Sequence, residues 1–445
     1  MEMHRDKVEA AALAGLVRED RVHSGVYEDP AIFKLEMDLI FGRAWIYVGH
    51  ESEVPNRGDF VTTQMGLQPV IVSRHRDGKV YVLHNRCGHR AAIVCNEERG
   101  NTGGSFRCGY HGWTFRTNGE LLAAPLKNGY PESYDLRSKE FGLVPVRVES
   151  YRGFLFANLN AGMEQDFDLA AHLGPMTMCI DALCDRAPEG EIEISGGVQK
   201  YTIHANWKTQ LENLNDLYHP PYSHESTVRE TGKQFARRPG DDQGPQIVEA
   251  DSDERKSKWD RLGVWAFDHG HSYCGSIQAD ADDAESRGGA IIERYKAALL
   301  AKHSPERVVE ILKERYHNAV FYPNVCIQLM SHHVRVLRPL AVDRTEIRVY
   351  PIRLKGAPEE MYHDIVRYLN ITHSPASLIQ TDDLEMFRRI QEGAHSRGAE
   401  WVVFGRGFGQ EISDAGGLKG TGTSEISMRN QYRAWADYMR AGVSS

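Results

Sequence analysis

The first residues of this chain that could do chemistry are two pairs of cysteine and histidine. Cys87 and His89 have one residue between them, Cys108 and His111 have two, and 18 residues separate the pairs. Thiolates and imidazoles are the protein ligands typical of zinc and of iron–sulfur clusters. The spacing therefore predicts two loops that hold four ligands around one metal centre.

The spacing within the pairs favours iron over zinc. Zinc ribbons and fingers mostly use pairs of ligands two to four residues apart. A C-x-H pair followed by a C-x2-H pair instead resembles the Rieske motif, in which two thiolates bind one iron of a [2Fe–2S] cluster and two imidazoles bind the other. Zinc binding is one alternative, and buried cysteines beside incidental histidines are another. The resemblance implies four cluster ligands: Cys87, His89, Cys108 and His111.

Residues around this motif bear on the type of cluster. High-potential Rieske proteins carry two further cysteines that bridge the cluster loops, and Ala92 and Tyr110 stand at the corresponding places. The resemblance thus implies the low-potential type, near the bottom of a range of about −150 to +300 mV. Trp113 either packs over the cluster or is an ordinary core residue, and Cys95 lies outside both pairs. Seven cysteines, an odd number, fit a reducing compartment without disulfides.

A second candidate metal site follows in the segment LENLNDLYHPPYSHEST. His219 and His224 are five residues apart, and Asp216 lies three residues before the first. A helix through this segment should stop near Pro220 and Pro221, and this break would let both imidazoles turn toward one point. Two satisfied surface histidines are the alternative. Non-haem Fe(II) oxygenases bind iron with two histidines and one carboxylate. The carboxylate must come from elsewhere, and IQTDDLEMFRR offers three candidates: Asp382, Asp383 and Glu385.

The two motifs together resemble the large subunit of the Rieske non-haem iron aromatic-ring-hydroxylating oxygenases. The similarity covers most of the chain, and it includes the segments IYVGHESEVPNRGDF, YRGFLFANL, NWKTQLEN and MRNQYRAWADYM. The family pattern implies that Asp383 is the third iron ligand, with Asp382 as the fallback. It also implies that Asp216 joins His89 of one chain to His219 of its neighbour by hydrogen bonds. A ring of three chains follows from this resemblance.

Further residues beside these motifs are expected to reach the substrate pocket, with ordinary core packing as the alternative for each. Leu214 and Ile379 suit an aromatic ring. His373 and Asn213 could meet a polar substituent, and Pro220 adjoins an iron ligand.

The elements that would position these residues differ along the chain. From about residue 58 to 158, β-rich runs and the hairpin turns Asp77-Gly78 and Asn118-Gly119 predict a small antiparallel domain. Later segments mix helices and hairpins. The segment SPERVVEILKERYH predicts a helix capped by Ser304 and carrying Val308, Leu312 and Tyr316 on one face. Residues 243–289 are rich in Asp, Glu, Ser and Gly, which predicts a long surface excursion without an assignable role.

Composition limits the class of protein. The 445 residues suggest two or three domains, and a net charge of −9 argues against nucleic acid and anionic membranes as partners. No apolar run is long enough for a membrane span, and the first 20 residues lack the apolar core of a signal peptide and suggest a surface helix. We therefore expect a cytoplasmic protein.

These observations lead to one expectation. The fold class is α+β: an N-terminal all-β Rieske [2Fe–2S] domain at residues 40–160, and a C-terminal α+β catalytic domain at 1–39 and 161–445, with an antiparallel sheet flanked by helices and a mononuclear Fe(II). The resemblance implies the large subunit of a multicomponent dioxygenase that forms a cis-dihydrodiol.

Because no dinucleotide-binding fingerprint is present, a separate reductase, with or without a ferredoxin, would supply electrons from NAD(P)H. The partners would be an aromatic substrate, O2, and two further large subunits, with or without three small β subunits. The alternatives are a monooxygenase or demethylase with the same metal sites, and an electron-transfer or zinc-stabilised protein.

Overall fold

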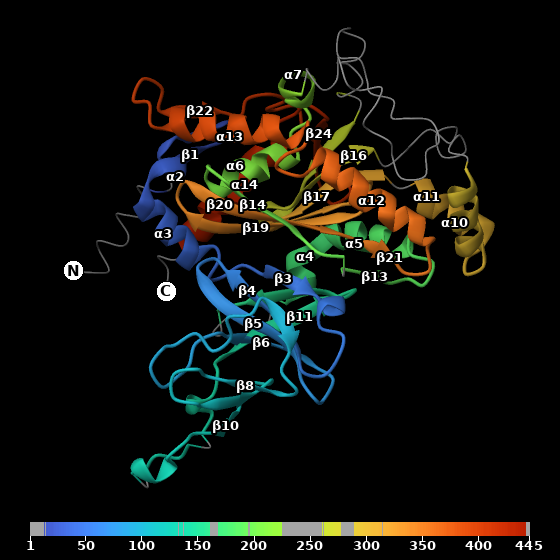
Figure 1. The fold of residues 1–445 in the computed structure, drawn as a ribbon. Coiled ribbons are helices and arrows are strands. Elements are labelled where there is room, and N and C mark those ends of the chain that lie inside the picture. The colour runs from blue at the N-terminus through green and yellow to red at the C-terminus, as the bar shows by residue number, and fades with distance from the viewer. Residues whose placement is uncertain are drawn as a thin grey trace. The chain divides into compact units, whose positions relative to one another are not determined.

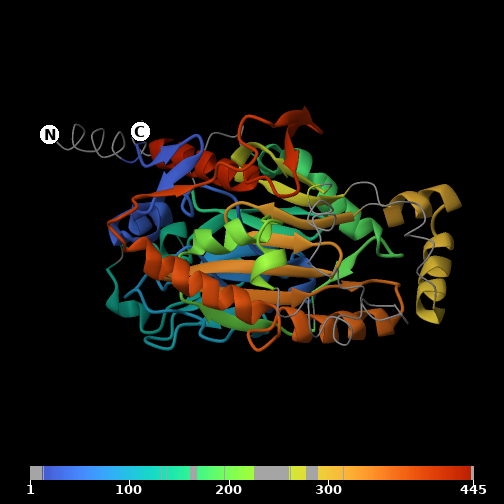
Figure 2. The same cartoon turned by 90° about the horizontal axis from the view of Figure 1, so that it is seen from above.

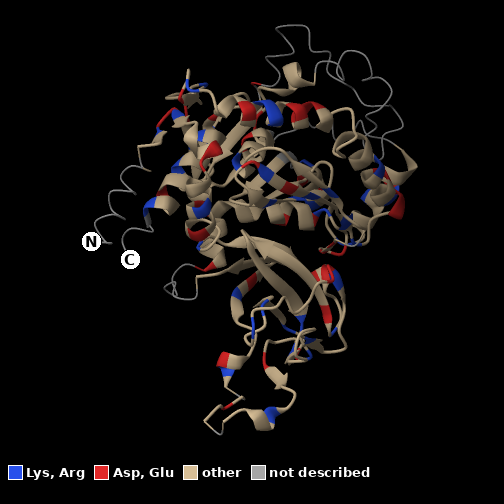
Figure 3. Ribbon diagram, turned by 60° about the vertical axis from the view of Figure 1, so that its left-hand side comes forward, with Lys and Arg blue, Asp and Glu red and all other residues tan. Residues whose placement is uncertain are grey.

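The computed structural model describes residues 13, 15–131, 133–136, 138–160, 168–194, 196–224, 260, 262–276, 289–313 and 315–441. They fall into two compact units (Figure 1). One unit is Phe41–Leu169, and the other combines the described residues up to Ile40 with those from Ala170 onward. Acidic and basic residues are interspersed along the ribbon of each unit (Figure 3).

The unit Phe41–Leu169 is built from antiparallel strands, as the sequence predicts. Its main sheet has the order β3-β12-β11-β6-β5-β4-β7, and a smaller one has the order β10-β9-β8. The strands are β3 (Ile46–His50), β4 (Asp59–Met65), β5 (Gln68–Arg74), β6 (Val80–His84), β7 (Arg99–Asn101), β8 (Ser105–Arg107), β9 (Thr114–Arg116), β10 (Leu121–Ala123), β11 (Pro145–Tyr151) and β12 (Phe154–Asn158). Three short 3-10 turns join them: η1 (Glu51–Glu53), η2 (Lys127–Gly129) and η3 (Lys139–Phe141).

Both predicted hairpin turns are confirmed in this unit. Gly78 joins β5 to β6 with φ of 85°, and Gly119 joins β9 to β10 with φ of 93°. Both angles lie in the left-handed region, which glycine adopts without a steric penalty. Gly119 also has no room for a side chain, because a Cβ would lie 2.8 Å from the Leu143 carbonyl oxygen. The turn sequences therefore determine where these strands reverse.

The second unit is organised around a nine-stranded antiparallel sheet of order β14-β20-β19-β18-β17-β16-β15-β24-β23. Its strands are β14 (Gln199–Ile203), β15 (Gly263–Ala266), β16 (Ser272–Ser276), β17 (Arg315–Phe321), β18 (Val325–Gln328), β19 (His333–Ala341), β20 (Arg344–Pro351), β23 (Ile412–Asp414) and β24 (Gly417–Thr421). Two small sheets complete the unit. They contain β1 (Val17–Arg18), β2 (Arg21–His23) and β22 (Trp401–Val403), and β13 (Ile192–Glu193) with β21 (Arg353–Leu354).

Helices pack on this sheet, and α6, α7 and α13 lie over one of its faces (Figures 1 and 2). The helices among the described residues are α2 (Gly25–Glu28), α3 (Pro30–Leu39), α4 (Leu169–Leu173), α5 (Thr177–Asp185), α6 (Trp207–Leu214), α7 (Pro220–Ser223), α10 (Ala290–Leu300), α11 (Pro305–Lys313), α12 (Glu359–Thr372), α13 (Gln380–Ala394) and α14 (Ile426–Ala441), with 3-10 turns η4 (Gly174–Met176) and η6 (Asp268–Gly270). None of the described helices is long and apolar enough to cross a membrane.

The prediction that residues 243–289 are a surface excursion is wrong for part of that segment. Strands β15 and β16 both come from it, and they lie inside the nine-stranded sheet. Val264, Tyr273 and Cys274 are fully buried there. The segment as a whole is acidic and glycine-rich, so its two short apolar runs did not stand out in the sequence. They become core strands because β15 pairs with β24 and β16 pairs with β17. The rest of that segment lies outside the described residues.

The helix predicted to run toward Pro220 ends earlier, at Leu214. The Asp216 side chain accepts hydrogen bonds from the backbone N–H groups of Tyr218 and His219, which gives the backbone a local turn instead of a helical continuation. Pro220 then begins α7 rather than ending a helix, since proline at the first helical position needs no N–H.

Two other helix predictions also need correction. The Ser304 hydroxyl caps α11 as expected, by accepting a hydrogen bond from the backbone N–H of Arg307. However, α11 ends at Lys313, and Tyr316 belongs to β17, because sheet pairing overrides the helical spacing there. Most of the helix expected over the first 20 residues lies outside the described residues, and Val17–Arg18 form a strand, β1.

Candidate metal centres

The two loops that carry the cysteine–histidine pairs have the same backbone design. The Cys87 N–H donates to the carbonyl of Ala92, and the Cys87 carbonyl accepts from the N–H of Ala91. The loop between β8 and β9 repeats this pattern. The Cys108 N–H donates to Trp113, and the Cys108 carbonyl accepts from Gly112. Ala91 and Gly112 both have left-handed φ angles, of 60° and 72°.

These matching loops bring the four predicted cluster ligands together. The Cys87 and Cys108 side chains are buried, His89 is half-buried, and His111 is exposed. The imidazole rings of the two histidines lie 4.5 Å apart between centroids. The indole ring of Trp113 stacks on His89 at 5.2 Å and almost parallel, at 4°. Trp113 thus holds the orientation of a candidate ligand in addition to filling the core.

The donor set fits a [2Fe–2S] cluster. Burial raises the pKa of the Cys87 thiol, and the adjacent Cys108 adds to that rise. Two buried thiols that face each other ionise only when a nearby positive charge stabilises both thiolates, which a bound iron supplies. Cys95 takes no part in this pair, because its thiol contacts the Glu97 carboxylate. None of the seven cysteines, which all lie among the described residues, forms a disulfide, so no disulfide bridges the loops.

The second candidate centre joins α7 to α13. His219 precedes α7, His224 follows it, and Asp383 lies in the first turn of α13. Their ligand atoms all lie within 4.8 Å of one another. The Asp383 Oδ1 atom is 3.7 Å from His219 Nε2 and 3.4 Å from His224 Nε2. This arrangement has the composition of the two-histidine, one-carboxylate iron site predicted from the sequence.

Further polar side chains contact these three candidate ligands. Asp216 Oδ2 lies 3.2 Å from His219 Nδ1, and Asp382 Oδ2 lies 3.3 Å from His224 Nδ1. Each histidine therefore directs Nε2 to Asp383 and Nδ1 to a different carboxylate. The Asn213 amide nitrogen lies 3.2 Å from both His219 Nε2 and Asp383 Oδ1. Carboxylates behind the imidazoles orient the rings and increase their basicity, as in known metal sites.

The electrostatics of the trio suit a cation. Burial alone would lower the pKa of His219, but the hydrogen bond and charge of Asp216, followed by the charge of Asp383, raise it overall. The site therefore stabilises positive charge where the three ligand atoms converge. Apart from the four candidate cluster ligands, the described residues contain no other group of three or more histidine, cysteine or acidic side chains close enough to hold a metal ion.

The residues predicted for the substrate pocket lie at different distances from this trio. Asn213 contacts it directly. Leu214 is buried at the end of α6, Pro220 begins α7, and Ile379 precedes α13. His373 follows α12 and packs its ring against His333, 4.8 Å away. Their contact with substrate stays a prediction.

Sequence reasoning missed the polar residues of the sheet beneath α6. The Asn318 amide donates to the Leu214 carbonyl, and the Gln328 amide donates to Asn318 Oδ1 at 2.9 Å. They come from β17 and β18, more than 100 residues after Leu214, and their spacing in the sequence has no recognisable period. Only the pairing of the strands could have pointed to them.

Comparison with known proteins agrees with this architecture. Residues 44–142 match the Rieske [2Fe-2S] domain, and residues 193–441 match the ring hydroxylating alpha subunit catalytic domain. Toluate 1,2-dioxygenase subunit alpha of Pseudomonas putida is 34% identical, over 85% of this chain and 81% of that protein. The anthranilate 1,2-dioxygenase large subunit of Acinetobacter baylyi is 33% identical, over 88% and 81%. A structure of naphthalene 1,2-dioxygenase with indole in its active site has a TM-score of 0.79 at 26% identity, over 96% and 94% of the two chains.

The fold and the two centres thus define an oxidoreductase with a Rieske domain and a mononuclear iron domain. The chain belongs to the family of ring-hydroxylating alpha subunits of Rieske dioxygenases. Its cofactors are one Rieske [2Fe–2S] cluster and one mononuclear iron. The expectations for fold class and dioxygenase function are confirmed, and the monooxygenase alternative is not favoured. The relatives are subunits of larger enzyme systems.

Proposed function

We propose that this chain inserts both atoms of O2 into an aromatic ring and releases a cis-dihydrodiol. The observation that carries this proposal is the convergence of His219 Nε2, His224 Nε2 and Asp383 Oδ1 in a chain that also has paired Rieske loops. A bound iron supplies oxygen activation and redox chemistry at such a site. The relatives are named for aromatic acids and for an aromatic hydrocarbon, so their names leave the polarity of the substrate open.

In this proposal the protein residues bind and orient. Residues 40–160 form the Rieske domain, and 1–39 with 161–445 form the catalytic domain. Four residues hold the cluster: Cys87, His89, Cys108 and His111. His219, His224 and Asp383 hold the mononuclear iron, while Asp216 and Asp382 fix the orientation of its imidazoles. The pocket beside the iron is formed by residues that include Asn213, Leu214, Pro220, His373 and Ile379.

The same proposal includes an assembly. Asp216 lies against His219 and is a quarter exposed, so a second protein can reach its carboxylate. We propose that His89 of a neighbouring chain binds Asp216 there and that electrons cross between chains by this route. A trimer of large subunits, with or without three small β subunits, would repeat the contact three times. A reductase, with or without a ferredoxin, supplies the electrons from NAD(P)H in the cytoplasm.

A single-turnover experiment tests the proposed reaction. The iron-loaded protein is reduced chemically, mixed with aromatic acids and aromatic hydrocarbons, and exposed to oxygen-18 gas. We expect a product with two labelled oxygens on one ring, detected by mass spectrometry. One labelled oxygen, or loss of a methyl group, would instead indicate a monooxygenase or a demethylase. As a control, His219→Ala should give no product while keeping the Rieske absorption.

A further inference from the structure

Arg335 is a buried arginine in the middle of the nine-stranded sheet. It lies on β19, opposite Cys326 of β18 on one side and Val349 of β20 on the other. Only 4% of its surface is exposed. Arginine is almost never fully buried unless its charge is paired, because moving an unpaired charge out of water is very unfavourable. Its surroundings therefore need an explanation.

The side chain of Arg335 lies on the face of the sheet that packs against α6, the helix that leads into the candidate iron site. Alternate residues of a strand share a face, so His333 and Arg335 lie on the same side of β19. The imidazole of His333 packs on His373 at the end of α12. Gln328, directly opposite His333, binds Asn318, which in turn binds the Leu214 carbonyl of α6. This face of the sheet therefore lies beneath α6 and the end of α12.

Arg335 has no partner among the residues that the structure describes. Its guanidinium makes no side-chain hydrogen bond or ion pair with them, and its buried Nε has no acceptor. Two neighbouring arginines of the same sheet, in contrast, each have a counter-ion. Arg338 and Arg348 both bind the Glu346 carboxylate, at 2.8 Å and 2.6 Å. Each of these two arginines therefore has a carboxylate counter-ion, whereas Arg335 has none among the described residues.

A second unpartnered donor lies on the same face. Tyr201 of β14 pairs with Ile347, which pairs with Leu337, two residues beyond Arg335. The Tyr201 hydroxyl is buried and has no hydrogen-bond partner among the described residues. Burial raises the pKa of this phenol, Arg335 acts against that rise, and the Asp383 charge adds to it. Tyr201 therefore lies within electrostatic reach of both Arg335 and the candidate iron ligand Asp383.

We propose that the Arg335 guanidinium binds the carboxylate of an aromatic acid substrate, with the Tyr201 hydroxyl as a second hydrogen-bond donor. This inference rests on the proposed function, which supplies the aromatic ring. The flat guanidinium fork matches a carboxylate with two parallel hydrogen bonds. One arginine and one neutral phenol balance a single negative charge, whereas a phosphate carries about two at neutral pH. Arg335 is thus a determinant of substrate class rather than a ligand of the iron.

Binding of two matched probes to the iron-loaded full-length protein tests the proposal. Benzoate and benzamide have nearly the same shape and differ in charge. We expect wild type to bind benzoate at least tenfold more tightly than benzamide by titration calorimetry. Arg335→Met should raise the Kd for benzoate by about 10- to 100-fold and leave that for benzamide unchanged. Tyr201→Phe should raise the benzoate Kd by roughly threefold to tenfold.

Two further variants separate a lost charge from a damaged fold. Arg335→Lys keeps the charge but not the fork, so its Kd for benzoate should fall between wild type and Arg335→Met. Arg344→Met removes an exposed arginine at the start of β20 and should bind both probes as wild type does. The proposal is overturned if wild type does not prefer benzoate, or if Arg335→Met retains that preference.

Turnover separates this inference from the proposed function. If neutral arenes give doubly labelled product but benzoate neither binds nor reacts, the choice of aromatic acids is wrong and ring dioxygenation stands. If benzoate binds through Arg335 but no aromatic compound reacts in the protein with both centres loaded, the proposed reaction is wrong and the anion site stands.

Discussion

At the scale of residues, the most informative feature is how each imidazole of the candidate iron site uses its two nitrogens. The Nε2 atoms of His219 and His224 face Asp383, and their Nδ1 atoms face Asp216 and Asp382. The two adjacent aspartates of α13 therefore have different tasks. In the proposed site, Asp383 would complete the set of metal ligands, and Asp382 would orient His224 through its Nδ1 atom.

This division predicts different outcomes for two alanine substitutions. Asp383→Ala removes a ligand, so the purified variant should lack the mononuclear iron. Asp382→Ala removes only the partner of His224 Nδ1, so iron affinity should fall by about 10- to 100-fold, and excess Fe(II) should restore loading. Iron content per chain before and after incubation with Fe(II) distinguishes the two. The reverse pattern would show that Asp382 is the ligand.

Glu212 is a second residue whose surroundings give a testable consequence. Burial raises the pKa of this carboxyl from 4.5 to about 7, although hydrogen bonds from Tyr432 and Tyr27 and the charge of Lys208 act against the rise. Between these two pH values the folded protein holds a proton that the unfolded chain has lost. The free energy of unfolding therefore decreases as pH rises through this window, by about 3 kcal/mol in total.

Glu212→Gln should remove this pH dependence. The amide oxygen can accept the same hydrogen bonds from the Tyr27 and Tyr432 hydroxyls, but the side chain cannot ionise. We expect the variant to unfold at a higher temperature than wild type at pH 8, with a smaller difference at pH 5. Thermal unfolding of both proteins across this range checks it. Parallel curves of melting temperature against pH would mean that Glu212 does not titrate in this range.

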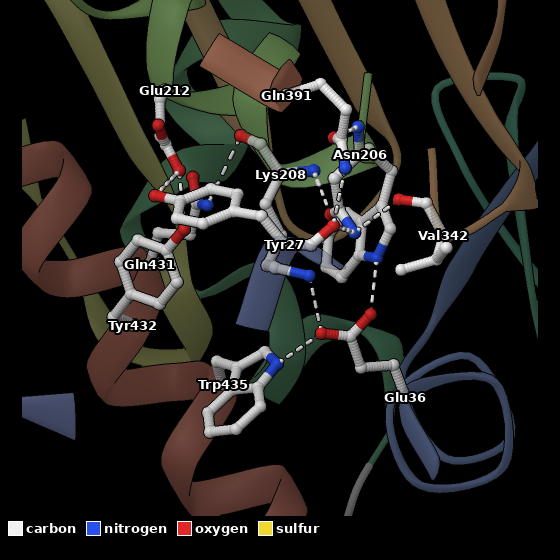
Figure 4. A network of polar contacts seen from close by, with 11 residues as sticks. Tyr27, Glu36, Asn206, Lys208, Glu212, Val342, Gln391, Gln431, Tyr432 and Trp435 are labelled. Atoms are coloured by element: carbon white, nitrogen blue, oxygen red, sulfur yellow. Dashed lines mark hydrogen bonds and ion pairs between the residues drawn. The ribbon is translucent and has the colours of Figure 1, made fainter. Parts of the chain in front are cut away.

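At the scale of elements, helix α6 depends on a buried network that ties it to α3 and α14 (Figure 4). Lys208 of α6 and Glu36 of α3 form an ion pair of 2.5 Å, with both side chains fully buried. The indole N–H groups of Trp207 and Trp435 also donate to Glu36. Because α6 leads directly into Asp216 and His219, this network holds the helix that positions one side of the iron site.

Breaking one partner of this pair should be costly. Lys208→Met leaves the Glu36 carboxylate buried without its counter-ion, which should reduce the free energy of unfolding by about 3–5 kcal/mol. The double variant Glu36→Gln with Lys208→Met removes both charges, so it should recover part of that loss. Chemical denaturation of the three proteins measures the effect. A double variant less stable than Lys208→Met would show that the charges are not the main cause.

At the scale of the whole molecule, the two candidate centres lie in two different compact units. Each unit should therefore keep its metal when the other loses its own. We expect three irons and two acid-labile sulfides per chain in wild type. His224→Ala should retain two irons and both sulfides, and Cys108→Ala should retain one iron and no sulfide. Iron and sulfide analysis with visible absorption spectra tests this, and joint loss of all iron in either variant would contradict it.

The sequence by itself determined the class of chemistry, because ligand type and spacing are local. Cys87, His89, Cys108 and His111 are close in sequence, and their loops are bounded by turns that glycine specifies. His219 and His224 are similarly close. The strands of the Rieske domain could also be predicted, since alternation and hairpin turns are short-range signals.

Only the tertiary structure decided which distant residues meet these motifs. It placed Asp382 behind His224, and it paired β15 and β16, which come from a polar segment, with other strands of the nine-stranded sheet. It also placed Arg335 on the sheet face beneath α6 without a counter-ion among the described residues. The physical reason is that strand pairing and burial of charge depend on residues that can lie far apart along the chain, whose contacts leave no periodic pattern in the sequence.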